Sequence, residues 1–307
     1  MQIYLPIADT PVDIFLILGM GLAVGYISGL FGIGGGFLMT PLLIFIGISP
    51  AVAVATVSTH IVASSFSGAI NYWRKRTIDP ALAMMLLSGG IIGTSSGVWL
   101  FDALHTLGQL ELVISLCYVT LLTGVGGVMI YESVWAIIRT RRGVQATLRR
   151  PGSHTWIHNL PLKFRFKRSR IYVSVIPVWG IGYVMGFIGA IMGIGGGFLL
   201  VPMLIYLLRV PTVTVIGTSM VLTLITMASA TVMHAATNHL VDAVLALILA
   251  VGGVIGAQFG VRTGQTMRAE RLRLLLGLLI FAVGMRFAYE LVIEPDDIYS
   301  LRYVTGA

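Results

Sequence analysis

The heptapeptide GIGGGFL occurs twice in this chain of 307 residues, at positions 32–38 and 193–199. Both copies lie in apolar sequence, and each is followed three residues later by a proline, Pro41 or Pro202. Consecutive glycines disfavour a regular helix, and proline removes a backbone donor. Both copies therefore expose polar backbone, which a membrane tolerates only where that backbone lines a cavity enclosed by protein.

Composition places the chain in a membrane. Hydrophobic residues make up 57% of it and charged residues only 10%, which excludes an ordinary soluble domain and indicates a polytopic membrane protein. The net charge is +8, but half of the 20 basic residues fall within positions 139–170, where no acid occurs. This pattern favours a cytoplasmic loop against anionic lipids over a site for nucleic acid.

The apolar segments form two similar series. The matches beyond the heptapeptide are PAVAVATVS at 50–58 with PTVTVIGTS at 211–219, Ile78-Asp79 with Val241-Asp242, and GGIIG at 89–93 with GGVIG at 252–256. Matches in constant order indicate a duplicated unit. The expected segments are 12–31, 37–48, 50–73, 81–101 and 110–138, followed by 172–192, 198–208, 211–236, 243–261 and 272–293.

We therefore predict an all-α polytopic membrane protein with two inverted repeats of about five transmembrane elements each. A short broken helix follows each glycine-rich turn, because about twelve residues at 1.5 Å each cover only about 18 Å of a core about 30 Å thick. The expected parts are a first repeat at 1–138, a basic cytoplasmic linker at 139–171, a second repeat at 172–293 and an acidic tail at 294–307.

Charge placement favours inversion. If each short segment crosses the membrane, every half has five crossings, and this odd number inverts the second half relative to the first. Nearly all the bases then lie on the cytoplasmic side, and nearly all the acids outside the membrane core lie on the opposite side. Re-entrant short segments would instead give parallel repeats and turn the arginines at 262–273 outward. The favoured arrangement places both termini outside.

A half-helix that begins near the midplane directs unsatisfied N–H groups and the positive end of its dipole into the protein. Inversion would bring the two turns toward one centre, where they could hold a small anion. The residues expected to do so are Gly34, Gly35, Gly36, Gly195, Gly196 and Gly197. For the scattered glycines Gly21, Gly25 and Gly29, at GxxxG spacing, we expect close helix packing instead.

Polar side chains recur at matched positions in both halves. Thr56 and Ser58 in the first half and Thr218 and Ser219 in the second lie about two turns into the next segment. Their hydroxyls could donate to a substrate, or bond to a backbone carbonyl one turn back. Both interpretations are open.

Two histidines lie within apolar segments. His60 is near the middle of the third segment, and His234 aligns with Asn71 of the other half. An imidazole at membrane depth could carry a coupling proton or bind an anion, or be satisfied structurally by one carbonyl. Gln258 follows a glycine-rich stretch and is a further candidate for the cavity lining, with helix contact as the alternative.

No catalytic constellation is visible in the sequence. It contains no metal-ligand spacing, no GxSxG elbow and no phosphate-binding GxxxxGK[ST] loop. We expect neither an enzyme nor a nucleotide-driven pump, and no cofactor or metal.

With the doubled GIGGGFL turns, the TVS and GTS stretches and the GGxIG repeats in view, the chain resembles the sulfite exporter TauE/SafE family from about position 21 to 284. The resemblance implies a carrier of the bacterial inner membrane for small sulfur-containing anions such as sulfite or organosulfonates, usually drawn as an exporter. It carries over to Gly32, Pro41, Gly193 and Pro202 in addition to the turn glycines and hydroxyls above.

The predicted mechanism is alternating access of a secondary transporter around a midplane anion site. The alternative is an anion channel with the same pore lining, which non-saturating conductance would favour. The expected partners are the anion, a coupling proton or cation, and anionic lipids at the basic loop. The expected location is the bacterial inner membrane, with both termini periplasmic.

Overall fold

The computed structural model describes residues 2–31, 35–74, 76–141, 161–166, 169, 171–208, 212–264 and 269–292. Gly32, Gly34, most of the basic loop and the acidic tail lie outside these ranges.

The described residues form ten α-helices, one for each predicted apolar segment. The first five are α1 (Ile14–Phe31), α2 (Gly36–Phe45), α3 (Pro50–Arg74), α4 (Pro80–Thr106) and α5 (Leu110–Arg141). The second five are α6 (Val175–Met192), α7 (Gly197–Tyr206), α8 (Thr212–Met233), α9 (Ala243–Gly264) and α10 (Ala269–Val292). One π-helical turn, η2 (His234–Asn238), extends α8. The prediction of an all-α membrane protein is confirmed.

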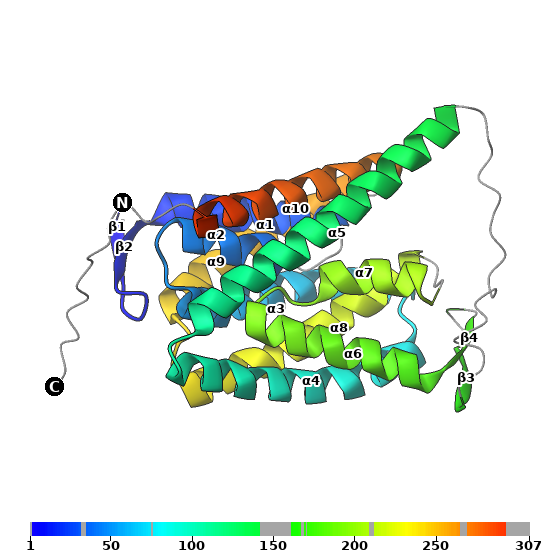
Figure 1. The fold of residues 1–307 in the computed structure, drawn as a ribbon, viewed down its shortest axis with the longest axis horizontal. Coiled ribbons are helices and arrows are strands. Elements are labelled where there is room, and N and C mark those ends of the chain that lie inside the picture. Colours follow the sequence, from blue (N-terminus) through cyan, green and yellow to red (C-terminus); the bar gives the residue numbers. More distant parts are fainter. Residues whose placement is uncertain are drawn as a thin grey trace.

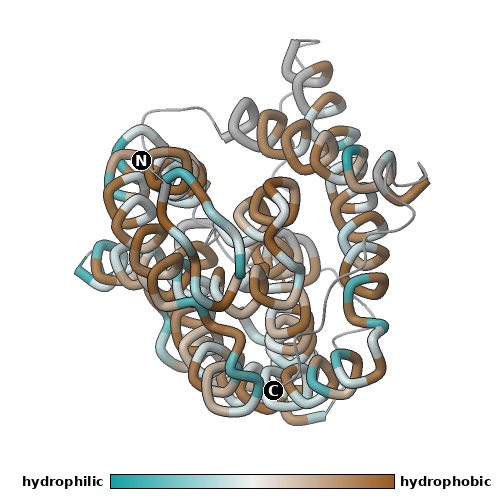
Figure 2. The backbone as a smooth tube through the Cα atoms, turned by 90° about the vertical axis from the view of Figure 1, so that its left-hand side faces the viewer, coloured by the Kyte–Doolittle hydropathy of each residue, from teal (hydrophilic) through white to brown (hydrophobic). Residues whose placement is uncertain are grey.

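The helices have the length and apolar character of membrane spans. Seven of them are long and apolar enough to cross a bilayer, and α2, with ten residues, is shorter. Most of the helical backbone carries hydrophobic residues (Figure 2). The chain is therefore a multi-pass membrane protein.

Two short β-hairpins, absent from the sequence prediction, precede α1 and α6. Strands β1 (Gln2–Leu5) and β2 (Thr10–Asp13) pair antiparallel, as do β3 (Lys163–Phe166) and β4 (Ile171–Ser174). The hairpins lie at opposite ends of the helix bundle (Figure 1). Each half of the chain therefore opens with a hairpin and continues with five helices.

The halves interlock through glycine-lined helix pairs. Helix α1 packs against α9, and α6 packs against α4. A Cβ atom added at Gly25 would lie 2.4 Å from the carbonyl oxygen of Gly253, and one at Gly186 would lie 2.1 Å from that of Gly90. Only glycine permits such backbone contact. The packing role expected for Gly21, Gly25 and Gly29 is confirmed, because all three face the backbone of α9.

Corresponding helices of the two halves run in opposite directions. Helices α3 and α8 cross antiparallel, since Ser58 bonds to Thr231 while Gly68 lies against Met220. Helices α5 and α10 are also antiparallel, as the contact of Gly126 with Phe281 and that of Gly284 with Thr123 require. A twofold axis between the halves would produce these directions, and the inverted repeat stays a prediction.

Charge is distributed unevenly along the bundle. We call the end with β1 and β2 the acidic end, because Asp9 and Asp13 lie there and α4, which carries Asp102 in its last turns, runs toward it from the other hairpin. We call the end with β3 and β4 the basic end, because α3 and α9 run toward it in parallel and finish near Arg74 and Arg262.

Candidate functional site

The two glycine-rich turns meet in the interior of the protein. A Cβ atom at Gly36, the first residue of α2, would lie 2.5 Å from the carbonyl oxygen of Gly193. The next residues of the two short helices, Phe37 and Phe198, stack with ring centroids 5.6 Å apart, and both are buried. The turns are therefore direct neighbours at the start of α2 and α7.

Positive backbone dihedrals start both short helices. Gly35 precedes α2 with φ of 72°, and Gly196 precedes α7 with φ of 65°. Gly193 and Gly195 also have positive φ, of 65° and 78°. An L side chain rarely adopts this conformation, so the glycines are required by the turn itself. Neither short helix receives a side-chain cap on its first N–H groups.

Side chains from three other helices hold the carbonyls of the second turn. The hydroxyl of Tyr118 in α5 donates to the Met192 carbonyl at 2.6 Å. Thr40 in α2 donates to Gly193 at 3.3 Å, and Thr223 in α8 donates to Gly195 at 3.0 Å. The carbonyls of Met192, Gly193 and Gly195 are thus occupied, and the turn is held by side chains of α2, α5 and α8.

Several backbone N–H groups of the two turns, unlike these carbonyls, lack hydrogen-bond partners among the described residues. Ile194, Gly195 and Gly196 are buried, and among the described residues their N–H groups make no hydrogen bond. The same holds for the N–H groups of Gly35 and Gly36. A buried donor without a partner costs about 1–3 kcal/mol, so this cluster of N–H groups is suited to an acceptor such as a small anion.

The surroundings of the turns are apolar. The buried side chain of Ile61, near the middle of α3, fits between them: a Cβ at Gly36 would lie 2.2 Å from its Cδ1, and a Cβ at Gly195 would lie 3.0 Å from its Cγ2. Helices α1, α2, α6 and α7 contain no charged residue. A low-dielectric setting strengthens each N–H interaction with an anion.

The predicted hydroxyls have backbone partners. Ser58 donates to the Ala55 carbonyl and accepts from Thr231, and Ser219 donates to Ile216 at 2.9 Å. These are the bonds to a carbonyl one turn back that the sequence left open. A role for these hydroxyls in binding substrate stays a prediction.

Thr56 and Thr218 belong to a matched pair of networks that sequence analysis missed. The Thr56 hydroxyl accepts the N–H of Asp242 at 3.1 Å, and Thr218 accepts that of Asp79 at 3.4 Å. Both aspartates are buried, and each accepts two N–H groups from the first turn of the helix that follows it. The signal in the sequence was an aspartate just before an apolar run in each half, which is typical of an N-cap.

Each aspartate also binds the hairpin at its own end of the bundle. Asp242 accepts the N–H groups of Ile7 and Ala8, in the turn between β1 and β2, at 3.0 and 3.4 Å. Asp79 accepts the N–H and the hydroxyl of Ser169, between β3 and β4, each at 2.8 Å. The two networks repeat the same chemistry at opposite ends of the molecule.

The remaining candidates are scattered. His234 in η2 contacts the Ala190 carbonyl through Nε2 at 3.2 Å and the Asn238 side chain through Nδ1 at 3.1 Å. Asn71 donates to the Ser67 carbonyl one turn back. Gln258 is exposed on α9.

The two prolines lie within the short helices. Pro41 is buried in α2, and Pro202 lies in α7, where its side chain is outside the described residues. Among the described residues no group of histidine, cysteine and acidic side chains is arranged to hold a metal ion.

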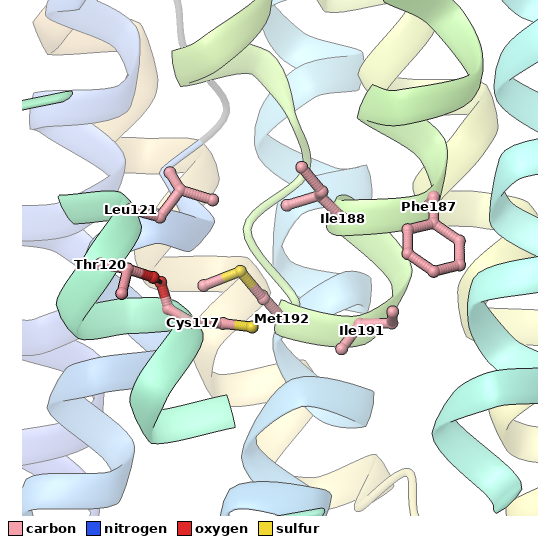
Figure 3. Close-up of a pocket in the computed structure, with 7 residues that line it drawn as sticks. All are labelled: Cys117, Thr120, Leu121, Phe187, Ile188, Ile191 and Met192. Atoms are coloured by element: carbon pink, nitrogen blue, oxygen red, sulfur yellow. Dashed lines mark hydrogen bonds between the residues drawn. The ribbon is translucent and has the colours of Figure 1, made fainter. Parts of the chain in front are cut away.

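An apolar groove lies beside the second turn, between α5 and α6. Its volume is about 280 Å³, and its lining includes Cys117 and Thr120 from α5 and Phe187, Ile188 and Met192 from α6 (Figure 3). Apolar side chains dominate the lining, so the groove lacks the donors that an anion needs. We therefore place the candidate anion site at the turns and not in the groove.

These features define a polytopic helical membrane protein with two broken helices that start at its centre. The sequence matches the family described as "Sulfite exporter TauE/SafE" over residues 17–287. The chain belongs to this family of membrane transporters. No solved structure matches it.

Relatives from several organisms share the family. The "Probable membrane transporter protein YunE" of Bacillus subtilis (strain 168) is 22% identical over 90% of this chain and 97% of its own length. A "Probable membrane transporter protein" of Xylella fastidiosa (strain 9a5c) is 29% identical over 89% of this chain and 94% of its own. The "Sulfite exporter TauE/SafE family protein 1" of Arabidopsis thaliana is 53% identical over 17% of this chain and 12% of its own.

Proposed function

We propose that this protein is a secondary transporter that exports small sulfur-containing anions such as sulfite or organosulfonates. The observation that carries the proposal is the cluster of buried N–H groups without partners where the two glycine-rich turns meet. These dipolar groups bind an anion without a fixed buried cation. A buried lysine or arginine would cost free energy whenever no anion is bound, and it would release a bound anion slowly. The family and its named relatives support the choice of a sulfur oxyanion.

The proposed mechanism is alternating access. The halves interlock through the glycine-lined pairs α1 with α9 and α4 with α6, so the moving parts would combine helices of both halves. The antiparallel relation of α3 to α8 supports an inverted repeat, in which a twofold rotation about an axis in the membrane plane would relate the inward-open and outward-open states. The short helices would move with the turns and expose the anion to one side at a time.

We further propose a bacterial inner membrane location with the basic end in the cytoplasm. The grouping of Arg74 and Arg262 at that end supports this orientation, since arginine and lysine are retained inside. Asp9 and Asp13 near the N-terminus would then lie outside. The basic loop at 139–171, with the lipid contact predicted for it, would be cytoplasmic.

Flux in proteoliposomes tests the transport function. We expect saturable, protein-dependent movement of sulfite or of a small sulfonate such as methanesulfonate, driven by the anion gradient. Absence of such movement for both anions would refute the proposal. Large currents that do not saturate with anion concentration would instead indicate the channel alternative.

The glycine-rich turns are tested by Gly36→Val. The new side chain would collide with Ile61 and with the backbone of Gly193 and Ile194, so the N–H groups of the two turns could no longer close on one anion. We expect loss of flux with the protein still monodisperse in detergent. Gly180→Ala in α6 is the matched control, because its Cβ would meet no atom within 4 Å. Wild-type flux in Gly36→Val would exclude the turns as the anion site.

A further inference from the structure

His60 is a buried ionisable residue: one of its ring nitrogens has a hydrogen-bond partner, and the other has none among the described residues. The side chain is fully buried in the middle of α3. Its Nδ1 lies 2.8 Å from the carbonyl oxygen of Leu249 in α9. Its Nε2 is buried and, among the described residues, has no hydrogen-bond partner. The next residue along α3, Ile61, contacts both glycine-rich turns, while the ring of His60 lies against Leu249 and Gly253 of α9.

The contact with Leu249 decides which ring nitrogen carries the proton. A carbonyl oxygen only accepts, so Nδ1 must donate to it and is protonated. In the neutral ring Nε2 is then a bare acceptor. It cannot donate a hydrogen bond to an anion. It can only bind a proton or accept a hydrogen bond from a donor. His234 differs, because both of its ring nitrogens have partners.

Gly253 makes the space for this ring. A Cβ atom at Gly253 would lie 2.2 Å from Cε1 of His60 and 2.6 Å from Nδ1. The glycine that brings α9 against α1 at Gly25 thus also seats the imidazole against the carbonyl of Leu249. The orientation of the ring is therefore set by the packing of three helices.

Within the part of the chain that the structure describes, no charged side chain is bonded to His60. The elements packed against α3 are α1, α2, α5, α6, α8 and α9. Helices α1, α2, α6 and α8 have no charged residue, and the charged side chains of the other two are Arg262 in α9 and, in α5, Glu111, Glu132, Arg139 and Arg141. Among the described residues none of these forms an ion pair or hydrogen bond with His60.

We propose that His60 is the proton-binding residue of this transporter and that its Nε2 takes up one proton with each anion. Neutral imidazole, a proton and a monoanion give an imidazolium and a bound anion of opposite charge within the same protein interior, so no net charge is added to it. Such pairing lowers the cost of burying the anion. The proton and the anion then cross in the same direction. This inference rests on the proposed function, because it names the ion that accompanies the transported anion.

A paired measurement of anion and proton movement tests the proposal. In proteoliposomes loaded with a pH-sensitive dye, an inward methanesulfonate or sulfite gradient should acidify the lumen in the wild type. His60→Asn is the decisive variant, since the amide nitrogen of asparagine can replace Nδ1 as donor to Leu249 while Nε2 is removed. We expect this variant to lose the proton movement. His234→Gln, whose amide can retain the contact with Ala190, is the matched control and should keep it.

A second readout follows the ring directly. In ¹⁵N-histidine spectra of the purified protein, we expect a signal with a bare Nε2 that is absent in His60→Asn and that becomes an imidazolium when sulfite is added. Anion flux without proton movement in the wild type, proton movement retained in His60→Asn, or a ring that stays neutral with sulfite bound would each overturn the role of His60. A wild type that moves neither anion would overturn the transport function itself.

Discussion

Replacing Asp242 by asparagine should free the N-terminal hairpin while leaving α9 capped. The two carboxylate oxygens divide their work: Oδ1 accepts from Val244 and Leu245 at the start of α9, and Oδ2 accepts from Ile7 and Ala8. Asparagine keeps one acceptor oxygen and is itself a good N-cap residue. The retained oxygen should therefore serve α9, and the new NH₂ group should face the two N–H groups of the hairpin.

The expected loss follows from these two bonds. The loss of each hydrogen bond leaves a backbone N–H without its acceptor, which costs about 1–3 kcal/mol. The lower value applies because both bonds are only partly buried. Two bonds then amount to about 2 kcal/mol. At about 1.4 kcal/mol for each factor of ten, local opening of the hairpin should become about 30-fold more frequent.

Hydrogen exchange measured by mass spectrometry in nanodiscs checks this value. We expect exchange at Ile7 and Ala8 to accelerate about 30-fold in Asp242→Asn, with the start of α9 unchanged. Asp102→Asn, which removes an exposed carboxylate from α4, is the control for the loss of charge. Unchanged exchange in the hairpin, or faster exchange confined to α9, would refute the division of roles between the two oxygens.

Two further predictions concern packing around the site. Gly25→Ala should lower the thermal unfolding midpoint, because its Cβ would lie 2.4 Å from the Gly253 carbonyl oxygen, at a cost of about 1–3 kcal/mol. Gly19→Ala is the control and should leave the midpoint unchanged, because its Cβ would meet no atom within 4 Å. Equal midpoints for the two variants would contradict the helix contact. Tyr118→Phe leaves the buried Met192 carbonyl without its 2.6 Å donor and should destabilise the protein by about 1–3 kcal/mol in the same assay, and an unchanged midpoint would show that the hydroxyl does not hold the turn.

Much of the fold could be predicted from the sequence because the signals are local. Apolar runs of about 20 residues report membrane helices wherever they occur, and the GIGGG stretches mark breaks whatever packs around them. The ten predicted segments coincide with ten helices in the described part of the chain. Strands of four residues carry too little pattern to be recognised, and both hairpins were therefore missed.

The candidate site was only partly predictable for a related reason. The glycines of the turns were identified, and the structure places the described ones side by side. The roles of Asp79 and Asp242 were missed, because each binds a hairpin far away in the sequence, and no local pattern announces such a partner. For Thr56 the hydroxyl proved to accept from a backbone N–H 186 positions away.

The sequence by itself determined that this is a membrane protein of duplicated halves, each with a helix broken at three consecutive glycines, because hydropathy and backbone freedom are properties of the residues themselves. Only the tertiary structure decided which groups meet. It brought the two turns together, and it set His60 against a carbonyl 189 positions further along the chain, so that Nδ1 became the donor and Nε2 the open acceptor. These contacts depend on how helices of the two halves pack together, and that packing cannot be predicted from any single segment.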